Sequence, residues 1–129
     1  GLRTHIEVFG TDYPTPDGTC VRDYIHVSDL AAAHTSALKY LRGGNESIVA
    51  NCGYGRGFSV AEVLASVERA AGHAFDIRHA PRRDGDPAFV VSDPSRAKQM
   101  LGWSPQYDNL DLIVSHALEW EKRLQLRNF

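Results

Sequence analysis

The stretch Cys20–Gly44, CVRDYIHVSDLAAAHTSALKYLRGG, decides the fold class. Its first part, Cys20–Val27, alternates between apolar and polar residues, the period of two that predicts a strand. The apolar positions are Val21, Ile25 and Val27, and the polar ones are Arg22, Tyr24 and His26. From Ser28, a predicted N-cap, apolar residues recur at helical spacing until Gly43-Gly44 ends the run. A strand followed directly by a helix predicts an α/β fold.

The flanking sequence repeats this alternation and predicts one α/β domain over residues 1–129. Ser59-Val-Ala-Glu62 is a capping box that opens a helix ending at Gly72. The last helix, Asn109–Leu124, is expected to bury Ile113, Ala117, Trp120 and Leu124. The remaining elements expected are strands at His5–Phe9, Ser47–Cys52 and Phe75–Ala80, and a helix from Asp93-Pro94 to Gly102.

Composition excludes several functional classes. The chain carries 14 basic and 16 acidic side chains, a net charge of -2, so no broad basic surface for nucleic acid is expected. No apolar run reaches the length of a membrane span, and the N-terminus does not resemble a signal peptide. Cys20 and Cys52 form neither a zinc knuckle nor a disulfide framework, so we expect no metal site and a reducing, cytoplasmic location.

A glycine loop, Gly53-Tyr-Gly-Arg-Gly57, lies between a predicted strand and a predicted helix, where a dinucleotide-binding loop would lie. The Rossmann fingerprint requires its third glycine three residues after the second, whereas here Gly57 comes two residues after Gly55. We therefore favour a tight turn that needs positive φ over a cofactor site.

The loop Arg82-Arg-Asp-Gly-Asp86 combines two arginines with two carboxylates. An arginine pairs bidentately with phosphate oxygens and a carboxylate accepts from vicinal ribose hydroxyls, so the loop could bind a nucleoside diphosphate. A solvated loop of self-paired charges remains the alternative. Arg22 is either ion-paired or a second phosphate clamp, and Asp23, on the opposite side of the strand, is an unlikely partner for it.

Several signatures of catalysis are absent. The sequence contains neither Tyr-x-x-x-Lys nor Gly-x-x-Gly-x-x-Gly, Gly-x-x-x-x-Gly-Lys or Gly-x-Ser-x-Gly. His26 and His34 have no nucleophile or metal partner at recognisable spacing, and we assign them no role. We therefore expect a binding domain without catalytic or cofactor-binding residues.

Motifs along nearly the whole chain resemble the UDP-glucose 4-epimerase family of extended short-chain dehydrogenases/reductases. They are Val8-Phe-Gly-Thr-Asp-Tyr-Pro-Thr-Pro-Asp-Gly-Thr19, Val21-Arg-Asp-Tyr-Ile-His-Val27, Asn51-Cys-Gly-Tyr-Gly55, Ala80-Pro-Arg-Arg-Asp-Gly-Asp86, Asp93-Pro-Ser-Arg-Ala97 and Leu101-Gly-Trp103. The resemblance implies the C-terminal, UDP-sugar-binding portion of a Rossmann-type enzyme whose N-terminal NAD-binding half is not in this chain.

The resemblance also implies roles for particular residues. Arg22 and Arg83 would grip the UDP pyrophosphate, and Asp86 would hold the ribose. Phe9 would pack on uracil and Val60 would line the nucleotide. Val90 stands where some members carry a tyrosine against the hexose, so we hypothesise that the intact enzyme admits N-acetylated hexoses. A failure to convert UDP-N-acetylglucosamine would refute that hypothesis.

For the intact protein the resemblance implies a cytoplasmic, homodimeric isomerase of galactose metabolism, which interconverts UDP-galactose and UDP-glucose with NAD at sugar C4. This chain alone is expected to be inactive, to require its own N-terminal half as partner, and to expose apolar surface that faces that half. Two alternatives stay open, a related sugar-nucleotide epimerase or dehydratase, and a non-catalytic nucleotide-binding module.

Overall fold

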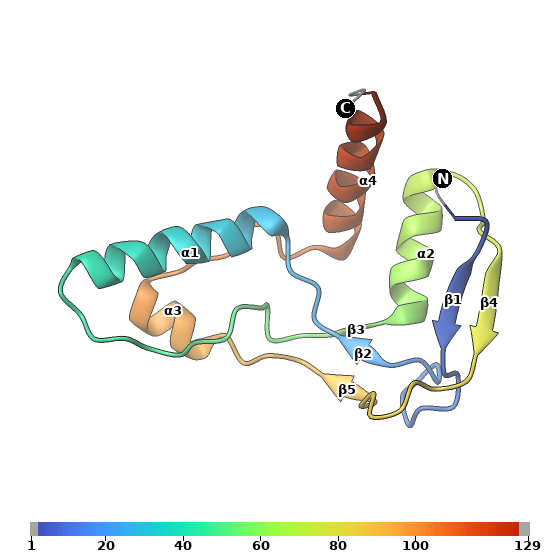
Figure 1. Ribbon diagram of the computed structural model, residues 1–129, viewed down its shortest axis with the longest axis horizontal. Coiled ribbons are helices and arrows are strands. Elements are labelled where there is room, and N and C mark those ends of the chain that lie inside the picture. Colours follow the sequence, from blue (N-terminus) through green and yellow to red (C-terminus); the bar gives the residue numbers. More distant parts are fainter. Residues whose placement is uncertain (1–2, 127–129) are drawn as a thin grey trace.

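The computed structural model describes residues 3–126, and it confirms the mixed α/β composition (Figure 1). Within these residues the chain forms four helices and five short strands, in the order β-β-α-β-α-β-β-α-α. The helices are α1 (Val27–Arg42), α2 (Val60–Ala71), α3 (Ser95–Leu101) and α4 (Leu110–Leu126), and the strands are β1 (Ile6–Phe9), β2 (Val21–Arg22), β3 (Phe58–Ser59), β4 (Ile77–Ala80) and β5 (Phe89–Val90).

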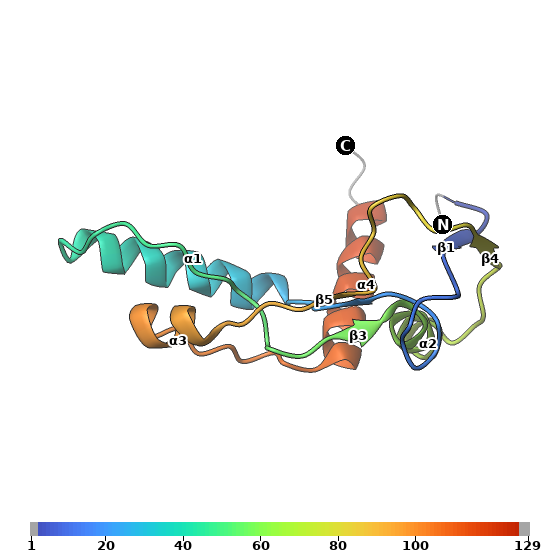
Figure 2. The same cartoon turned by 90° about the horizontal axis from the view of Figure 1, so that it is seen from below.

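The strands form two small sheets. β1 and β4 pair in parallel, with Ile6 opposite Ile77 and Phe9 opposite Ala80. The second sheet has the order β3-β2-β5, antiparallel on one side of β2 and parallel on the other. α2 lies beside the β1–β4 pair and packs against α4 (Figures 1 and 2). Three segments distant in sequence therefore meet around β2.

α1 and α3 pack together and form an arm that extends away from the strands (Figures 1 and 2). Its core is small, with Ala33, Ala97 and Trp103 almost fully buried. The Trp103 indole N–H donates to the Asp29 carbonyl at 2.9 Å, which fixes the connection after α3 to the start of α1. This arm depends on a few contacts and a polar network, because little apolar surface is buried in it.

The expected helix signals act as predicted in α2. The Ser59 hydroxyl accepts from the Glu62 N–H at 3.0 Å, while the Glu62 carboxylate accepts from the Ser59 N–H at 2.7 Å, a complete capping box. Gly72 closes the helix in the left-handed region at φ 76°. The stops at Gly43 and Gly102 are also confirmed.

Three strand and cap expectations are wrong. Residues 47–52 form no strand, and of Cys20–Val27 only Val21 and Arg22 pair in a sheet. α1 already begins at Val27, and its N-cap is His26, whose Nδ1 accepts from the Ser28 N–H at 3.0 Å. A ladder needs a neighbouring strand, and sequence alternation alone does not provide one.

The expected burial along α4 is only partly met, because Ile113 and Leu124 are half-buried whereas Ala117 and Trp120 are exposed. Val114 is the residue that α4 buries, whereas the Trp120 side chain is 52% exposed. Other large apolar side chains are exposed on α1 and the segment after it, and they include Val27, Leu38, Leu41 and Val49. Among the described residues no helix is both long and apolar enough to cross a membrane.

Candidate functional site

The structure brings most of the predicted site residues to one place around β2. Arg22 lies on β2, directly opposite Val90 of β5. Phe9 ends β1, and Arg83 and Asp86 lie in the loop between β4 and β5. Val60 opens α2 on the other side of β2, where its N–H donates to the Cys20 carbonyl at 3.1 Å. The strand pairing therefore gathers residues separated by up to 81 positions, from Phe9 to Val90.

The centre of this site is the carboxylate of Asp86, held between two arginines. Arg22 Nη2 donates to Asp86 Oδ1 at 2.5 Å, and Arg83 Nη2 donates to Asp86 Oδ2 at 2.9 Å. The Asp86 side chain is 16% exposed, against 62% for Arg83. Hydrogen bonds from Arg83, and then from Arg22, hold the pKa of Asp86 below its usual value, and the same contact raises the pKa of Arg83. The expectation that Asp23 is not the partner of Arg22 agrees with this geometry.

The neighbouring residues Arg82 and Arg83 contact different partners. Arg83 lies over the Phe9 ring, with its guanidinium carbon 5.0 Å from the ring centroid, and faces the Asp86 cluster. Arg82 donates to the carboxylate and the carbonyl of Asp12 and lies 4.2 Å from the Tyr13 ring centroid. Arg82 therefore ties down the loop that follows β1, and Arg83 is the one directed to the candidate site.

A half-buried pair of hydrogen bonds, the Asp23–Ser92 tie, holds the site segments together. Asp23 Oδ2 accepts from both the backbone N–H, at 3.1 Å, and the hydroxyl of Ser92. Gly53 lies against this pair so closely that a Cβ there would overlap Ser92 Oγ and Asp23 Oδ2. The tie thus joins the residue after Arg22, the segment after β5 and the glycine loop.

This packing also settles what the glycine loop does. Positive φ occurs at Gly55 alone among its three glycines, so the expectation of a turn needing positive φ is right for that one position. Gly57 has a different role, because its Cα packs against the side chains of Val21 and Val91. Side chains of the protein therefore fill the space beside both Gly53 and Gly57.

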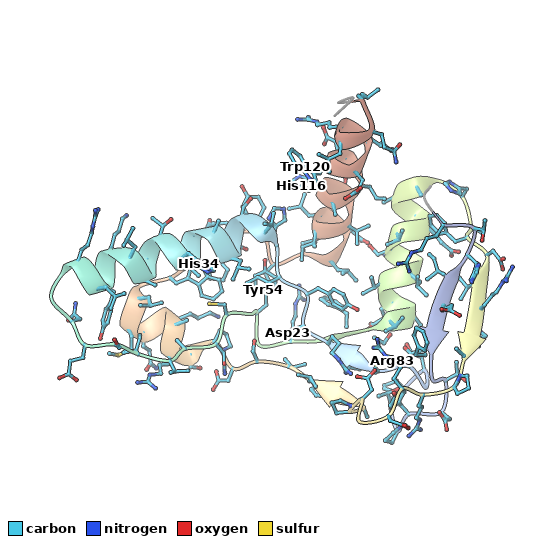
Figure 3. All side chains as sticks on the ribbon, in the orientation of Figure 1. Asp23, His34, Tyr54, Arg83, His116 and Trp120 are labelled. Atoms are coloured by element: carbon cyan, nitrogen blue, oxygen red, sulfur yellow. The ribbon has the colours of Figure 1, made fainter. Side chains whose placement is uncertain are left out.

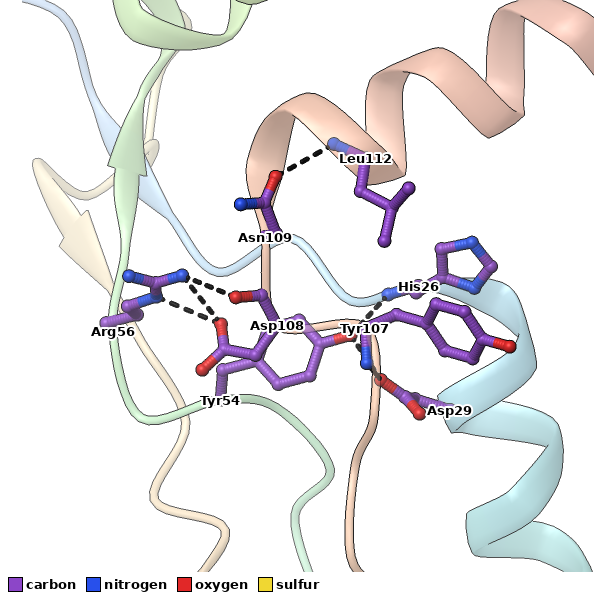
Figure 4. A network of polar contacts seen from close by, with 8 residues as sticks. All are labelled: His26, Asp29, Tyr54, Arg56, Tyr107, Asp108, Asn109 and Leu112. Atoms are coloured by element: carbon purple, nitrogen blue, oxygen red, sulfur yellow. Dashed lines mark hydrogen bonds and ion pairs between the residues drawn. The ribbon is translucent and has the colours of Figure 1, made fainter.

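A second polar network, centred on Asp29, lies at the start of α1 (Figure 4). This carboxylate is 2% exposed and accepts from the Tyr54 hydroxyl at 2.6 Å and from the backbone N–H groups of Gln106 and Tyr107 at 2.8 and 2.9 Å. Burial raises its pKa, but these hydrogen bonds outweigh burial and leave the pKa below its usual value. Burial, and then the bond to Asp29, raise the pKa of Tyr54 to about 12.

Sequence reasoning missed the part that His26 plays beside this network. The His26 Nδ1 accepts from Ser28, so the neutral ring carries its proton on Nε2, which lies 3.0 Å from His116 Nδ1. His26 also stacks on Tyr107 at 4.4 Å between centroids. A partner 90 residues away leaves no local signal in the sequence. The hydrogen bond of His34 stays within α1, where its Nδ1 lies 2.8 Å from the Leu30 carbonyl oxygen.

A cavity of about 590 Å³ lies between the start of α1 and α4, away from the Asp86 cluster. Its walls are mainly apolar, and His116 and Trp120 contribute to them from α4 (Figure 3). Within residues 3–126 no group of acidic, histidine or cysteine side chains is arranged to hold a metal ion.

Comparison with known proteins gives a consistent set of relatives. The sequence profile of the GDP-mannose 4,6 dehydratase family matches residues 1–115. A UDP-glucose 4-epimerase of Azospirillum brasilense is 53% identical over 125 residues, which are 97% of this chain and 36% of that protein. The chain therefore spans about 36% of the length of this curated relative.

The solved structures that resemble this chain also include UDP-sugar 4-epimerases. The UDP-glucose 4-epimerase of Stenotrophomonas maltophila, with bound NAD and formylated UDP-arabinopyranose, superposes with a TM-score of 0.90 at 43% identity, covering 98% of this chain and 37% of that one. The UDP-Glc/GlcNAc 4-epimerase of Campylobacter jejuni gives a TM-score of 0.84 at 49% identity, covering 94% and 36%.

Proposed function

The chain belongs to the GDP-mannose 4,6 dehydratase family, and from that premise we propose that it forms the UDP-sugar-binding part of a UDP-glucose 4-epimerase. The relatives of known structure are UDP-sugar 4-epimerases of the Rossmann-type fold. The intact enzyme interconverts UDP-glucose and UDP-galactose by NAD-dependent oxidation and reduction at the sugar C4. This chain contributes the grip on the nucleotide and does not carry the redox step.

One observation carries the proposal, namely the convergence of Arg22, Arg83 and Asp86 beside the Phe9 ring. Two guanidinium groups from distant segments provide the positive charge and the directed donors that a diphosphate requires. The carboxylate between them can accept from ribose hydroxyls, and the aromatic ring offers a face for a base. Val60 and Val90 complete the expected lining, the first at the start of α2 and the second opposite Arg22.

The small side chain of Val90 supports the proposal that the intact enzyme accepts N-acetylated hexoses as well. Its side chain is small and 45% exposed at the end of β5, which leaves space for an N-acetyl group on the hexose. The C. jejuni relative, a UDP-Glc/GlcNAc 4-epimerase, fits this proposal. Conversion of UDP-N-acetylglucosamine by the intact enzyme is the measurement that decides it.

The partner that the chain needs is the NAD-binding half of its own enzyme. Val27 and Val49 are 74% and 82% exposed, and the cavity beside Trp120 has apolar walls. A surface of this kind is usually covered, and the relatives have most of their length outside the region that this chain matches. We place the intact enzyme in the cytoplasm as a homodimer, and the free thiols of Cys20 and Cys52 fit a reducing compartment.

The proposal is tested by calorimetric titration of UDP into the chain and into its Arg83→Ala variant. A hydrogen bond between charged groups contributes about 1.5 to 3 kcal/mol, so loss of Arg83 should weaken UDP binding roughly 10- to 150-fold. Arg82→Ala is the matched control, because it removes the same charge one residue away and leaves the Asp86 cluster intact.

Equal losses in the two variants would show that only overall charge matters, and would contradict the assignment of Arg83. If the wild-type chain is folded and does not bind UDP, the same titration is repeated on the complete natural polypeptide that contains it. Failure of that protein to bind UDP would overturn the proposed function. Titration of dTDP is the control, because dTDP differs from UDP in both the base and the pentose.

A further inference from the structure

The ring of His26 has both of its nitrogens committed to neighbours. Its Nδ1 accepts from the Ser28 N–H at 3.0 Å, and this bond caps α1. Because a backbone N–H can only donate, Nδ1 carries no hydrogen and the neutral ring holds its hydrogen on Nε2. That Nε2–H donates to His116 Nδ1 at 3.0 Å. One backbone amide therefore fixes the proton positions on two rings that lie 90 residues apart in the sequence.

The two rings connect helices that pack mainly on different neighbours. His26 lies at the start of α1, which packs against α3, and His116 lies on α4, which packs against α2. His26 is 6% exposed and stacks on the Tyr107 ring (Figure 4), whereas His116 is exposed. The pair thus ties the arm formed by α1 and α3 to α4, and a proton from solvent can reach it through His116.

An added proton does not fit this arrangement. On His26 Nδ1 it would face the Ser28 N–H, and on His116 Nδ1 it would face the His26 Nε2–H, so two donors would meet in either place. The rings can share the proton only if His26 moves its own hydrogen to Nδ1 and accepts from His116 through Nε2. That tautomer gives up the cap. Each route therefore loses either the bond to Ser28 or the bond between α1 and α4.

We propose that His26 and His116 form a pH-sensitive latch, which holds the arm to α4 while both rings are neutral and opens when the pair takes up a proton. Histidine ordinarily changes its charge between about pH 5 and 8, so the latch responds within that range. The latch does not rest on the proposed nucleotide site, because the hydrogen bonds of the two rings involve neither Arg22 nor Arg83.

Three titratable groups face His26 from its own helix and from two loops. The Asp29 carboxylate of α1 attracts a charged His26, which favours proton uptake, but it already accepts from the Tyr54 hydroxyl and from two backbone N–H groups. The Tyr54 oxygen accepts from the backbone N–H of His26 at 3.1 Å. Tyr107 contributes the face of its ring. Asp29 therefore acts on the pair through its charge and does not replace a lost hydrogen bond.

The charged groups on the α4 side have partners or positions of their own. Glu119 is paired with Arg123, and Asp108, ahead of α4, is paired with Arg56. Glu121 lines the apolar cavity beside both rings. The hydrogen bonds that the two ring nitrogens of the latch make go to a backbone amide and to each other, so a protonated pair has no carboxylate acceptor already in place.

The test is hydrogen–deuterium exchange of the complete natural polypeptide at pH 7.5 and pH 5.5, with rates corrected for the pH dependence of an unstructured chain. The readout is the protection of the backbone amides of residues 28–30, in the first turn of α1. Loss of an N-cap changes such an equilibrium roughly 2- to 30-fold, and we expect protection in the wild type to fall by about 5-fold at the lower pH. His26→Asn keeps a capping side chain that cannot take up a proton, so its protection should change by less than about 2-fold.

Two further variants separate the pair from a single ring. In His116→Gln the amide oxygen accepts from the His26 Nε2–H but cannot share a proton, so the fall should be less than about 2-fold. His34→Gln is the matched control, because it removes another histidine of α1 whose hydrogen bond stays within the helix, and it should keep the wild-type fall.

Equal protection at both pH values in the wild type would overturn the latch. A fall as large as that of the wild type in His26→Asn or in His116→Gln would overturn it too, because acid would then act at another group. A fall that disappears in His34→Gln would likewise assign the effect to the wrong histidine.

Discussion

Asp29 and Asp86 both accept several hydrogen bonds, and the donors they use distinguish a structural centre from the proposed binding site. Asp29 is satisfied by the Tyr54 hydroxyl and two backbone N–H groups. Asp86 is satisfied by two arginine side chains. Neutral donors fixed by the backbone cannot move to a ligand, whereas a guanidinium on a long side chain can exchange one acceptor for another.

Exposure follows the same division. Asp29 is 2% exposed and lies where the connection after α3 meets the start of α1. Arg83, the most accessible member of the other cluster, has a side chain that is 62% exposed. We therefore expect the first carboxylate to matter for stability and the second for binding, and the predictions below test whether these two roles are separate.

The largest effect on stability is expected from Asp29→Ala. The change leaves one hydroxyl and two N–H donors without their acceptor, each at a cost of about 1 to 3 kcal/mol, so the free energy of unfolding should fall by about 3 kcal/mol or more. Urea denaturation measures this loss in the free energy of unfolding. The control is Asp76→Ala, which removes an exposed pair with Arg78 and should cost less than about 1 kcal/mol.

UDP affinity per folded molecule should remain close to wild type in Asp29→Ala, since the hydrogen bonds of Asp29 involve neither Arg22 nor Arg83. A variant as stable as Asp76→Ala would contradict the structural role of Asp29. A stable variant that had lost UDP binding would erase the distinction between the two clusters.

A smaller loss of stability, about 1 to 3 kcal/mol, is expected from Gly53→Ala. Gly53 lies between the two regions, because it packs on the Asp23–Ser92 tie behind the site and precedes Tyr54 of the Asp29 network. The added methyl group should therefore lower both stability and UDP affinity. Adding Ser92→Ala removes one of the overlapping atoms and should restore part of the stability.

Gly43→Ala is a suitable control for that variant, because its φ is -73° and the nearest atom to a new Cβ lies at 3.1 Å. A Gly53→Ala protein with normal stability and normal UDP binding would show that the tie does not position the site.

The smallest effect concerns the pH dependence of stability. The pKa of Asp29 is lowered in the folded protein from its ordinary 3.8, so its contribution is present above that value and is lost as the pH falls through the folded pKa. Tyr54→Phe removes one of the hydrogen bonds that lower it. The variant should be less stable by about 1 kcal/mol at pH 7, with a smaller difference near pH 3.

Urea denaturation at pH 7, 5 and 3 gives the three values needed. The Tyr54 phenol, with its pKa raised to about 12, stays protonated throughout that range and adds no titration of its own. A stability difference that is the same at every pH would show that the Tyr54 hydroxyl does not act through Asp29.

The local features of this protein could be predicted from its sequence. The Ser59–Glu62 capping box and the stops at Gly43, Gly72 and Gly102 are confirmed because each depends on residues within one turn of the chain. The residue types needed for a nucleotide site were also visible in the loop from Arg82 to Asp86. Short-range hydrogen bonding of this kind leaves a signal in the sequence, although the cap predicted for α1 at Ser28 was wrong by two residues.

Only the tertiary structure decided which residues meet. Arg83 pairs with Asp86, whereas its neighbour Arg82 pairs with Asp12. Arg22 pairs with a carboxylate 64 residues away, and His26, the cap of α1, lies beside a histidine 90 residues away. The tertiary structure also leaves residues 47–52 without a strand partner and Trp120 exposed. Pairing and burial depend on what the rest of the chain places alongside a segment, and no local pattern contains that information.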